Sequence, residues 1–176
     1  SLLALLFHWF GVSLLAEQVR YWIHVVTYSA MYAMLPWLSA NLGTGWRAGV
    51  VGGFIGAWLP VFPLTIGLGE ELAAIALGLL LVAMLRRWRS GSVSIGRCAL
   101  EGLAWGASFH LAPALLLVFL ALAGVEAWRF RRWSPAVALL CGAVVACGSW
   151  TYRNHAVFGQ WFFLRSNLGL ELRMGN

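Results

Sequence analysis

Residues 98–128 decide the layout of the helices, and they read CALEGLAWGASFHLAPALLLVFLALAGVEAW. One helix of this length would measure about 46 Å, whereas two helices would measure only about 22 Å each. Arginines cluster on both sides of the run, at residues 86–97 and 129–132, and the positive-inside tendency therefore places both ends in the cytoplasm. An even number of crossings follows, so we expect a tight helical hairpin that turns at residues 106–113, where small, polar and proline residues gather.

The composition is that of a membrane protein. Hydrophobic residues make up 61% of the chain, charged residues 10%, and the mean hydropathy is +0.81, whereas soluble domains carry roughly 25% charged residues. We therefore expect an all-α, polytopic bundle of transmembrane helices that forms a single membrane domain surrounded by membrane lipid. The chain starts at Ser1 inside an apolar stretch without an initiator Met, and we expect it to be a fragment that lacks N- and C-terminal regions.

Charge and cysteine use argue against nucleic-acid binding and against a metal site. The twelve basic residues are all arginine and the six acidic residues are all glutamate. The arginines stand in short clusters at the ends of apolar runs, as orientation signals do, so we expect no nucleic-acid partner. Cys98, Cys141 and Cys147 lie in apolar runs without the spacing of metal ligands. We expect small core residues there, with no metal and no cofactor.

The apolar runs predict the individual helices. Residues 1–20 mix polar and apolar side chains and predict an amphipathic helix in the membrane interface. Residues 21–42, 46–66 and 70–85 predict three spans, the first kinked at Pro36. The second has a packing face of small residues, namely Gly49, Gly52, Gly53, Gly56 and Ala57. With the hairpin and a last span at residues 135–152, the transmembrane part covers residues 21–152 in about six spans, and residues 153–176 form an extracytoplasmic loop.

Polar residues are expected to gather on one side of the membrane. Counted from the arginine clusters, the cytoplasmic turns lie near residues 46, 89 and 131. The opposite side then receives two carboxylates, an imidazole and the end of the chain, namely Glu70, Glu71, His110 and everything after Trp150. These groups would share one aqueous pocket on the extracytoplasmic face.

Two glutamates flank the predicted hairpin on its cytoplasmic side. Helical spacing would pair Glu101 with Arg97 and Glu126 with Arg129. We expect structural ion pairs there and no catalytic role.

The end of the last span carries the most specific motif. Residues 149–154 read SWTYRN, Phe158 and Gly159 follow, and residues 164–171 read LRSNLGLE. This block resembles the exit segment of GT-C superfamily glycosyltransferases of the family-39-like, protein O-mannosyltransferase-like branch, in which Pro-Trp-x-x-Arg-Asn and Arg-Ser-Asn-x-Gly recur. Ser149 stands where that family usually has proline.

The resemblance implies a hexosyl- or pentosyltransferase that moves a sugar from a polyprenyl-phosphate-linked donor to a glycan, lipid or protein acceptor. The reaction would be an inverting displacement with a carboxylate base, at the periplasmic or exterior face of a bacterial inner (plasma) membrane. In that family the base is an Asp in a loop upstream of an interfacial helix like residues 1–16, and this chain has no Asp. We therefore expect donor contacts but no catalytic residue in these 176 residues.

Five candidate substrate-binding residues lie in the exit block. An arginine fork such as that of Arg153, next to Asn154, suits a phosphate because it forms two parallel charge-assisted hydrogen bonds. The alternative is an interfacial arginine that reaches lipid headgroups. Arg165, Ser166 and Asn167 offer donors and acceptors for sugar hydroxyls or a phosphate, and the alternative there is a turn with local backbone hydrogen bonds.

Glu70 and His110 complete the candidates. Glu70 opens a helix, where a carboxylate stabilises the dipole, and Gly69-Glu70 is similar to a Ser-Glu of the family. His110 would carry a proton or contact an acidic headgroup; the alternative is an ordinary interfacial histidine. The family usually has Thr-Arg-Pro where this chain has Leu111-Ala112-Pro113, so the family's arginine is missing.

Two other functions fit the same residues. A transporter or flippase fragment would use broken helices, glycine faces and a membrane histidine as a translocation path. A non-catalytic assembly subunit is the third reading. An acidic pair in an upstream loop would indicate the enzyme, and repeated pairs of spans would indicate the transporter.

Overall fold

The computed structural model describes residues 7–58, 68–91, 94–131, 133–159 and 161. These residues form helices and turns without any strand, so the predicted all-α class is confirmed for them. Contacts along the chain define two compact units, unit 1 (Ser1–Gly78) and unit 2 (Leu79–Asn176). The boundary between them falls inside helix α5 (Leu68–Ser90). The stretch that was predicted as a single membrane domain thus comprises two compact units.

Unit 1 begins with α2 (Leu14–Ala33), which is capped by the Ser13 hydroxyl at 3.3 Å from the Ala16 N–H. The helix continues without a break through residue 20, where the sequence predicted an interfacial helix to end. The predicted boundary is wrong because the polar residues there support the helix. Glu17 and Arg20 form an ion pair of 2.8 Å across one helical turn, and such pairs stabilise helices.

Met34 separates α2 from α3 (Leu35–Leu42), and Pro36 lies in the first turn of α3. Proline lacks an N–H and clashes with the preceding turn, but it is tolerated in the first turn of a helix, and this is where it lies in α3. The expected kink is therefore present as a break between two helices. Gly43 ends α3 in the left-handed conformation, with φ of 89°, and the chain turns back into α4 (Trp46–Trp58).

The small residues of α4 let it approach α2 and α3 closely. A Cβ atom on Gly49 would lie 2.5 Å from the Pro36 Cα, and one on Gly53 would lie 3.0 Å from the Tyr32 carbonyl oxygen. Gly56 lies against the Tyr32 ring, whereas Gly52 faces open space. The predicted packing face is confirmed for three of its glycines. The predicted span over residues 46–66 continues beyond Trp58 into residues outside the described part of the chain.

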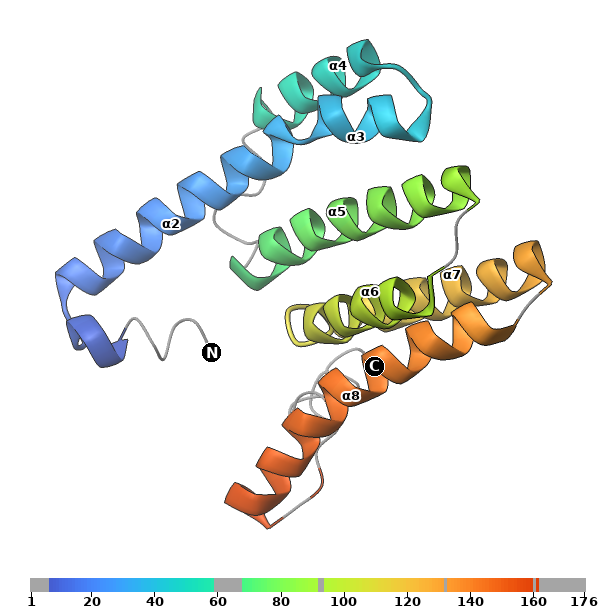
Figure 1. Ribbon diagram of the computed structural model, residues 1–176. Coiled ribbons are helices and arrows are strands. Elements are labelled where there is room, and N and C mark those ends of the chain that lie inside the picture. Colours follow the sequence, from blue (N-terminus) through green and yellow to red (C-terminus); the bar gives the residue numbers. More distant parts are fainter. Residues whose placement is uncertain (1–6, 59–67, 92–93, 132, 160, 162–176) are drawn as a thin grey trace, which may run out of the picture. The chain divides into compact units, whose positions relative to one another are not determined.

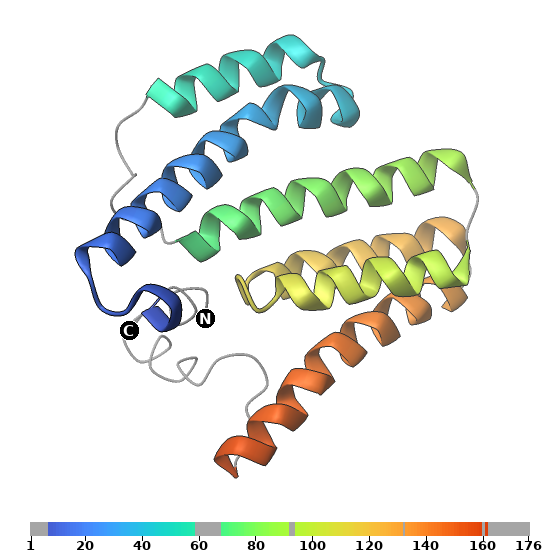
Figure 2. The same cartoon turned by 60° about the vertical axis from the view of Figure 1, so that its left-hand side comes forward.

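Unit 2 contains the rest of α5, then α6 (Ile95–Ser108), α7 (Leu115–Phe130) and α8 (Trp133–Phe158). The predicted hairpin is confirmed, because α6 ends at Ser108 and α7 starts at Leu115, and Figure 2 shows the two helices side by side. Trp105 and Phe109 pack on Phe119 of α7, with ring centroids 5.7 and 5.4 Å apart. Aromatic packing therefore closes the hairpin next to its turn.

Helices α6 and α8 lie in backbone contact through glycine. A Cβ atom on Gly102 would collide with the Leu139 carbonyl oxygen, and one on Gly142 with the Ala99 carbonyl oxygen. A Cβ atom on Gly106 would lie 2.6 Å from the Ala143 carbonyl oxygen. Small residues at this spacing allow helix backbones to approach more closely than side chains permit. The glycines thus hold the hairpin in register with α8.

Helix α8 is long and apolar enough to cross a membrane, and within the described ranges it is the one helix that meets both conditions. Helices α3, α4, α6 and α7 have only 8 to 16 residues. Helix α2 contains Glu17 and Arg20, and α5 contains several charged residues at both ends. One possible membrane helix is therefore observed, and the number of about six crossings stays a prediction.

Candidate functional site

Two of the predicted site residues, His110 and Arg153, meet at a tryptophan in unit 2. The Arg153 guanidinium carbon lies 5.1 Å from the centroid of the Trp150 ring, a cation–π contact. The His110 ring lies 5.1 Å from the same indole, with the ring planes inclined by 50°. His110 comes from the turn between α6 and α7, whereas Trp150 and Arg153 come from α8. We call these three residues the Trp150 cluster.

The position of His110 is set by the packing of the hairpin on α8. Its imidazole forms a hydrogen bond with the backbone of Ala146, and Gly106 allows the Ala146 region to lie close to α6. Burial lowers the pKa of His110 below its usual value of 6.5, an effect that the Ala146 bond partly opposes. The ring is therefore neutral at pH 7. The buried Nδ1 atom has no protein hydrogen-bond partner among the described residues.

The exit motif is helical, in contrast to the predicted loop that starts at residue 153. Helix α8 continues to Phe158 and ends at Gly159, which has φ of 68° and donates its N–H to the His155 carbonyl at 2.8 Å. The prediction is wrong because residues 153–158 contain neither glycine nor proline, so nothing in them stops the helix. Gly159 supplies the left-handed residue that commonly ends helices.

Neighbouring positions on this helix have different surroundings. Arg153 is exposed, whereas Asn154 is buried, with 7% of its surface accessible. Successive helical residues point about 100° apart. Asn154 therefore does not lie on the exposed surface that carries Arg153. The geometry gives no support for the two side chains binding one phosphate together.

A stacked aromatic pair lies beyond the predicted residues. The His155 and Trp161 rings are parallel within 8°, with centroids 4.0 Å apart. Trp161 is 66% exposed. A tryptophan after the end of an apolar helix is a sequence signal for a membrane interface, but its histidine partner becomes visible only in the structure.

The remaining candidates divide between the two units and the undescribed tail. Arg165, Ser166 and Asn167 lie outside the described residues. Glu70 is exposed in the first turn of α5 and belongs to unit 1. Whether Glu70 shares a pocket with His110 stays a prediction.

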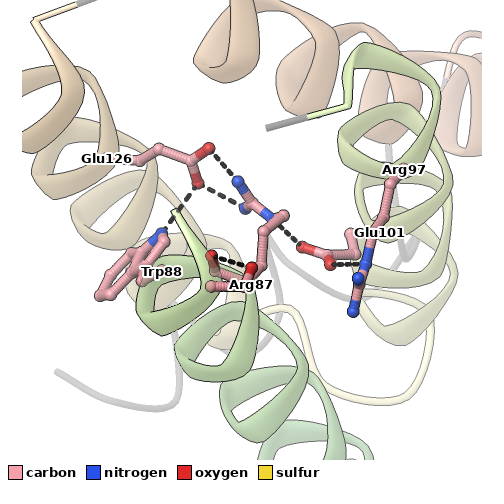
Figure 3. A network of polar contacts seen from close by, with 6 residues as sticks. Arg87, Trp88, Arg97, Glu101 and Glu126 are labelled. Carbon is pink, nitrogen blue, oxygen red and sulfur yellow. Dashed lines mark hydrogen bonds and ion pairs between the residues drawn. The ribbon is translucent and has the colours of Figure 1, made fainter. Parts of the chain in front are cut away.

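The acidic residues of the hairpin form a buried network with Arg87 of α5, shown in Figure 3. Arg87 and Glu126 have no accessible surface and form a two-point pair, of which the Nη2–Oε2 distance is 2.6 Å. The Arg87 Nε atom donates to Glu101 at 2.9 Å, and Trp88 donates to Glu126 at 3.4 Å. The predicted Arg97–Glu101 pair is confirmed at 3.4 Å. The prediction for Glu126 is wrong, because Arg87 replaces Arg129 as its partner.

Another buried carboxylate, that of Glu71, lies in unit 1, and the expectation that Glu71 faces an aqueous pocket is therefore wrong. Glu71 has no accessible surface, its Oε1 atom lies 2.9 Å from the His24 Nδ1 atom, and its Oε2 atom accepts a hydrogen bond from the Thr27 hydroxyl. An ionisable residue inside an apolar run, as His24 is, would have been the available signal. Its partner lies far along the chain and could not be read from spacing.

The Trp150 cluster and the buried carboxylate contacts do not have the composition of a metal centre. No group of three or more His, Cys, Asp or Glu that could hold a metal ion occurs in the described ranges. Cys98, Cys141 and Cys147 are free thiols, of which Cys98 and Cys147 are buried. The chemistry available at the Trp150 cluster is therefore that of a guanidinium, an imidazole and an indole.

Comparison with protein-family models, with curated proteins and with solved structures gave no match to this chain. The function of this chain is therefore inferred from its residues and from their geometry. Among the described residues, the Trp150 cluster is the place where predicted site residues meet.

Proposed function

We propose that this chain is part of an integral-membrane glycosyltransferase that takes a sugar from a polyprenyl-phosphate donor and transfers it to an extracytoplasmic acceptor. The observation that carries the proposal is the meeting of His110 and Arg153 on the indole of Trp150. Two residues predicted separately, one from the hairpin tip and one from the exit motif, thus lie against the same indole. The resemblance of residues 149–154 and 164–171 to the exit segment of such enzymes supports the same function.

The membrane setting rests on α8 and on the composition. Only 39% of the most apolar 18-residue stretch of α8 is buried inside the protein. A core helix of a soluble protein would be mostly buried. Valines on its exterior, such as Val144 and Val145 at 68% and 62% exposure, would contact lipid. In this setting the Trp150 cluster lies near the end of the span, where a lipid-linked phosphate would reach the interface.

The cluster offers separate contacts for a phosphate and for an apolar or sugar ring. The exposed guanidinium of Arg153 can bind two phosphate oxygens at once, and the cation–π contact with Trp150 holds it ready at a low entropy cost. Trp150 is itself 38% exposed, so part of the indole remains available to a sugar face or an isoprenoid. The neutral His110 adds a polar ring without a second positive charge.

Close packing gives the site a rigid support. The turn that carries His110 is attached to α6, and α6 is held on α8 by the contacts of Gly102, Gly106 and Gly142. A binding site on packed helices keeps its geometry better than one on loops. The side chains of the cluster therefore already have their binding positions before a donor arrives.

The test is donor binding to the full-length protein in lipid nanodiscs, with a short-chain polyprenyl phosphate as probe and the matching polyprenol as control. Arg153→Ala should weaken binding of the phosphate by about tenfold to a hundredfold, because hydrogen bonds to charged groups contribute about 1.5–3 kcal/mol. Arg153→Lys should recover part of this loss, since lysine restores the charge but not the fork. Polyprenol binding should not change.

The matched control is Arg129→Ala, which removes an exposed arginine at the other end of the hairpin. Binding by this variant should equal that of the wild type. Equal loss in both variants would mean that general surface charge attracts the phosphate. Wild-type binding and sugar transfer by Arg153→Ala would show that the Trp150 cluster is not the donor site.

A further inference from the structure

Exposed arginines gather at one end of unit 2, where α5 and α7 finish and α6 and α8 begin (Figure 1). The hairpin is antiparallel, so the first turn of α6 and the last turn of α7 share this end. Arg87 joins α5 to it through hydrogen bonds to Glu101 and Glu126 (Figure 3). We call this surface the basic end, and its exposed arginines are Arg86, Arg89, Arg97, Arg129 and Arg131.

The acidic residues of the basic end do not balance its charge. Six described arginines, the five exposed ones and Arg87, stand against two glutamates, Glu101 and Glu126, which gives a net charge of +4. Both carboxylates are buried and accept hydrogen bonds from Arg87. Among the described residues of unit 2, no carboxylate is exposed. The described surface of this end therefore carries positive charge only, and arginine keeps that charge at any physiological pH.

Arg131 occupies a backbone position that favours glycine. It caps α7 in the left-handed conformation, with φ of 47°, and within the described ranges it is the one residue other than glycine with positive φ. Residues with a Cβ atom adopt this conformation at a cost, and helices commonly end with glycine there. The backbone of the turn between α7 and α8 therefore gives no reason for an arginine.

Two exposed tryptophans flank the same turn. Trp128 in the last turn of α7 is 82% exposed, and Trp133 at the start of α8 is 76% exposed. In membrane proteins, indoles concentrate at the level of the lipid headgroups. Helix α8 continues from Trp133 with an exposed apolar side, on which Val137 and Leu140 lie. Arginines, indoles and an apolar helix side thus follow one another in the order of a headgroup layer and the acyl chains below it.

We propose that the basic end binds the headgroups of anionic phospholipids, with their phosphate groups on the arginines and their acyl chains along the apolar side of α8. Phosphate groups attract guanidinium groups by charge and accept paired hydrogen bonds from them. Arginine clusters beside a membrane helix attract acidic lipids, and the attraction grows with each arginine. Zwitterionic lipids bind less well because they carry no net charge. This inference rests on the membrane setting proposed above and not on sugar transfer.

The experiment is photo-crosslinking of the full-length protein in phosphatidylcholine nanodiscs that contain a photoreactive phosphatidylglycerol or, in parallel, a photoreactive phosphatidylcholine. Mass spectrometry of the peptides locates the crosslinks. The phosphatidylglycerol probe should label residues 128–133 at least about fivefold more than the phosphatidylcholine probe, since fivefold is the effect of one arginine near an acidic surface. Both probes should also label the apolar side of α8 around Val144 and Val145, which checks the membrane setting separately.

Arg131→Gly separates lipid binding from folding. This variant should lower the preference for phosphatidylglycerol by about fivefold. It should also raise the midpoint of thermal unfolding, because glycine adopts the left-handed conformation without strain. Arg131→Lys keeps the charge and should retain most of the preference. The control is Arg20→Ala in unit 1, which removes an exposed arginine that is ion-paired with Glu17 and should leave the preference unchanged.

Arg129→Ala distinguishes this surface from the proposed donor site. It should lower the phosphatidylglycerol preference at residues 128–133 while polyprenyl phosphate binding at the Trp150 cluster stays at the wild-type level. Equal labelling by the two probes, or an unchanged preference in Arg131→Gly, would overturn the proposal. Displacement of the probe by free glycerol phosphate would also overturn it, because a soluble phosphate would then be the occupant. Absence of labelling along α8 by either probe would contradict the membrane setting, and this inference with it.

Discussion

The two units bury carboxylates in different ways. In unit 2, Glu126 is held by two guanidinium nitrogens of Arg87 and by the indole of Trp88. In unit 1, Glu71 is held by His24 and Thr27. Arginine keeps its charge at every physiological pH, whereas histidine does not. The guanidinium network of unit 2 is therefore a permanent ion pair, whereas in unit 1 an imidazole and a hydroxyl surround the carboxylate.

The largest effect should come from removing Arg87. Arg87→Ala would leave Glu126 and Glu101 buried without their shared cation, and loss of one partner of a buried ion pair costs about 3–5 kcal/mol. Denaturant unfolding of the protein in detergent micelles measures the change. Arg89→Ala, two positions away and exposed, is the matched control, and equal destabilisation by both variants would contradict the buried network.

A smaller loss should follow from crowding the helix contact that supports unit 2. Gly102→Ala would place a methyl group on the Leu139 carbonyl oxygen, and overpacking of this kind costs about 1–3 kcal/mol. The same variant should weaken polyprenyl phosphate binding, because the hairpin tip and α8 would move apart at the Trp150 cluster.

Its control is Gly124→Ala in α7, where a Cβ atom would meet nothing within 4 Å. That substitution should be neutral or slightly stabilising, since alanine favours helices more than glycine does. Full stability and binding in Gly102→Ala would show that α6 and α8 do not rely on this close approach.

The stability of unit 2 should depend on pH through His110. Burial lowers the pKa of His110 in the folded state, so the unfolded state binds the proton more readily, and acid weakens folding through this residue. The loss begins as pH falls through the usual value of 6.5 and is complete below the lowered value.

The substitution His110→Gln removes the ionisable imidazole, so this residue no longer takes up a proton in acid. Thermal unfolding at a series of pH values should therefore show a shallower loss of stability on the acid side than the wild type shows. A steeper loss would mean that the protonated form of His110 is the one that the fold favours.

The smallest effect should come from an exposed ion pair. Glu17 and Arg20 are each about half exposed in α2, and pairs of this kind contribute only about 0.3–0.5 kcal/mol, an amount that salt reduces. Glu17→Ala should change the unfolding free energy by no more than this amount. A loss comparable with that of Arg87→Ala would end the distinction between buried and surface charge in this protein.

Local features were predictable where a single residue type controls the backbone. Pro36 predicted the break between α2 and α3, and the small and proline residues at 106–113 predicted the hairpin turn. Gly49, Gly53 and Gly56 predicted a packing face by their spacing alone. The errors at residues 20 and 153 share one cause: a change from apolar to polar side chains was interpreted as a helix boundary, although helices continue through polar residues.

The amino-acid sequence by itself determined the all-α class, the apolar character and the places where helices turn, because these depend on neighbouring residues and on backbone chemistry. Tertiary structure alone decided that Glu126 pairs with Arg87, that Glu71 pairs with His24, and that His110 meets Arg153 at Trp150. Each of these contacts joins residues from different helices or from a helix and a distant turn. Their distances follow from how the helices pack, and no local spacing in the chain encodes that packing.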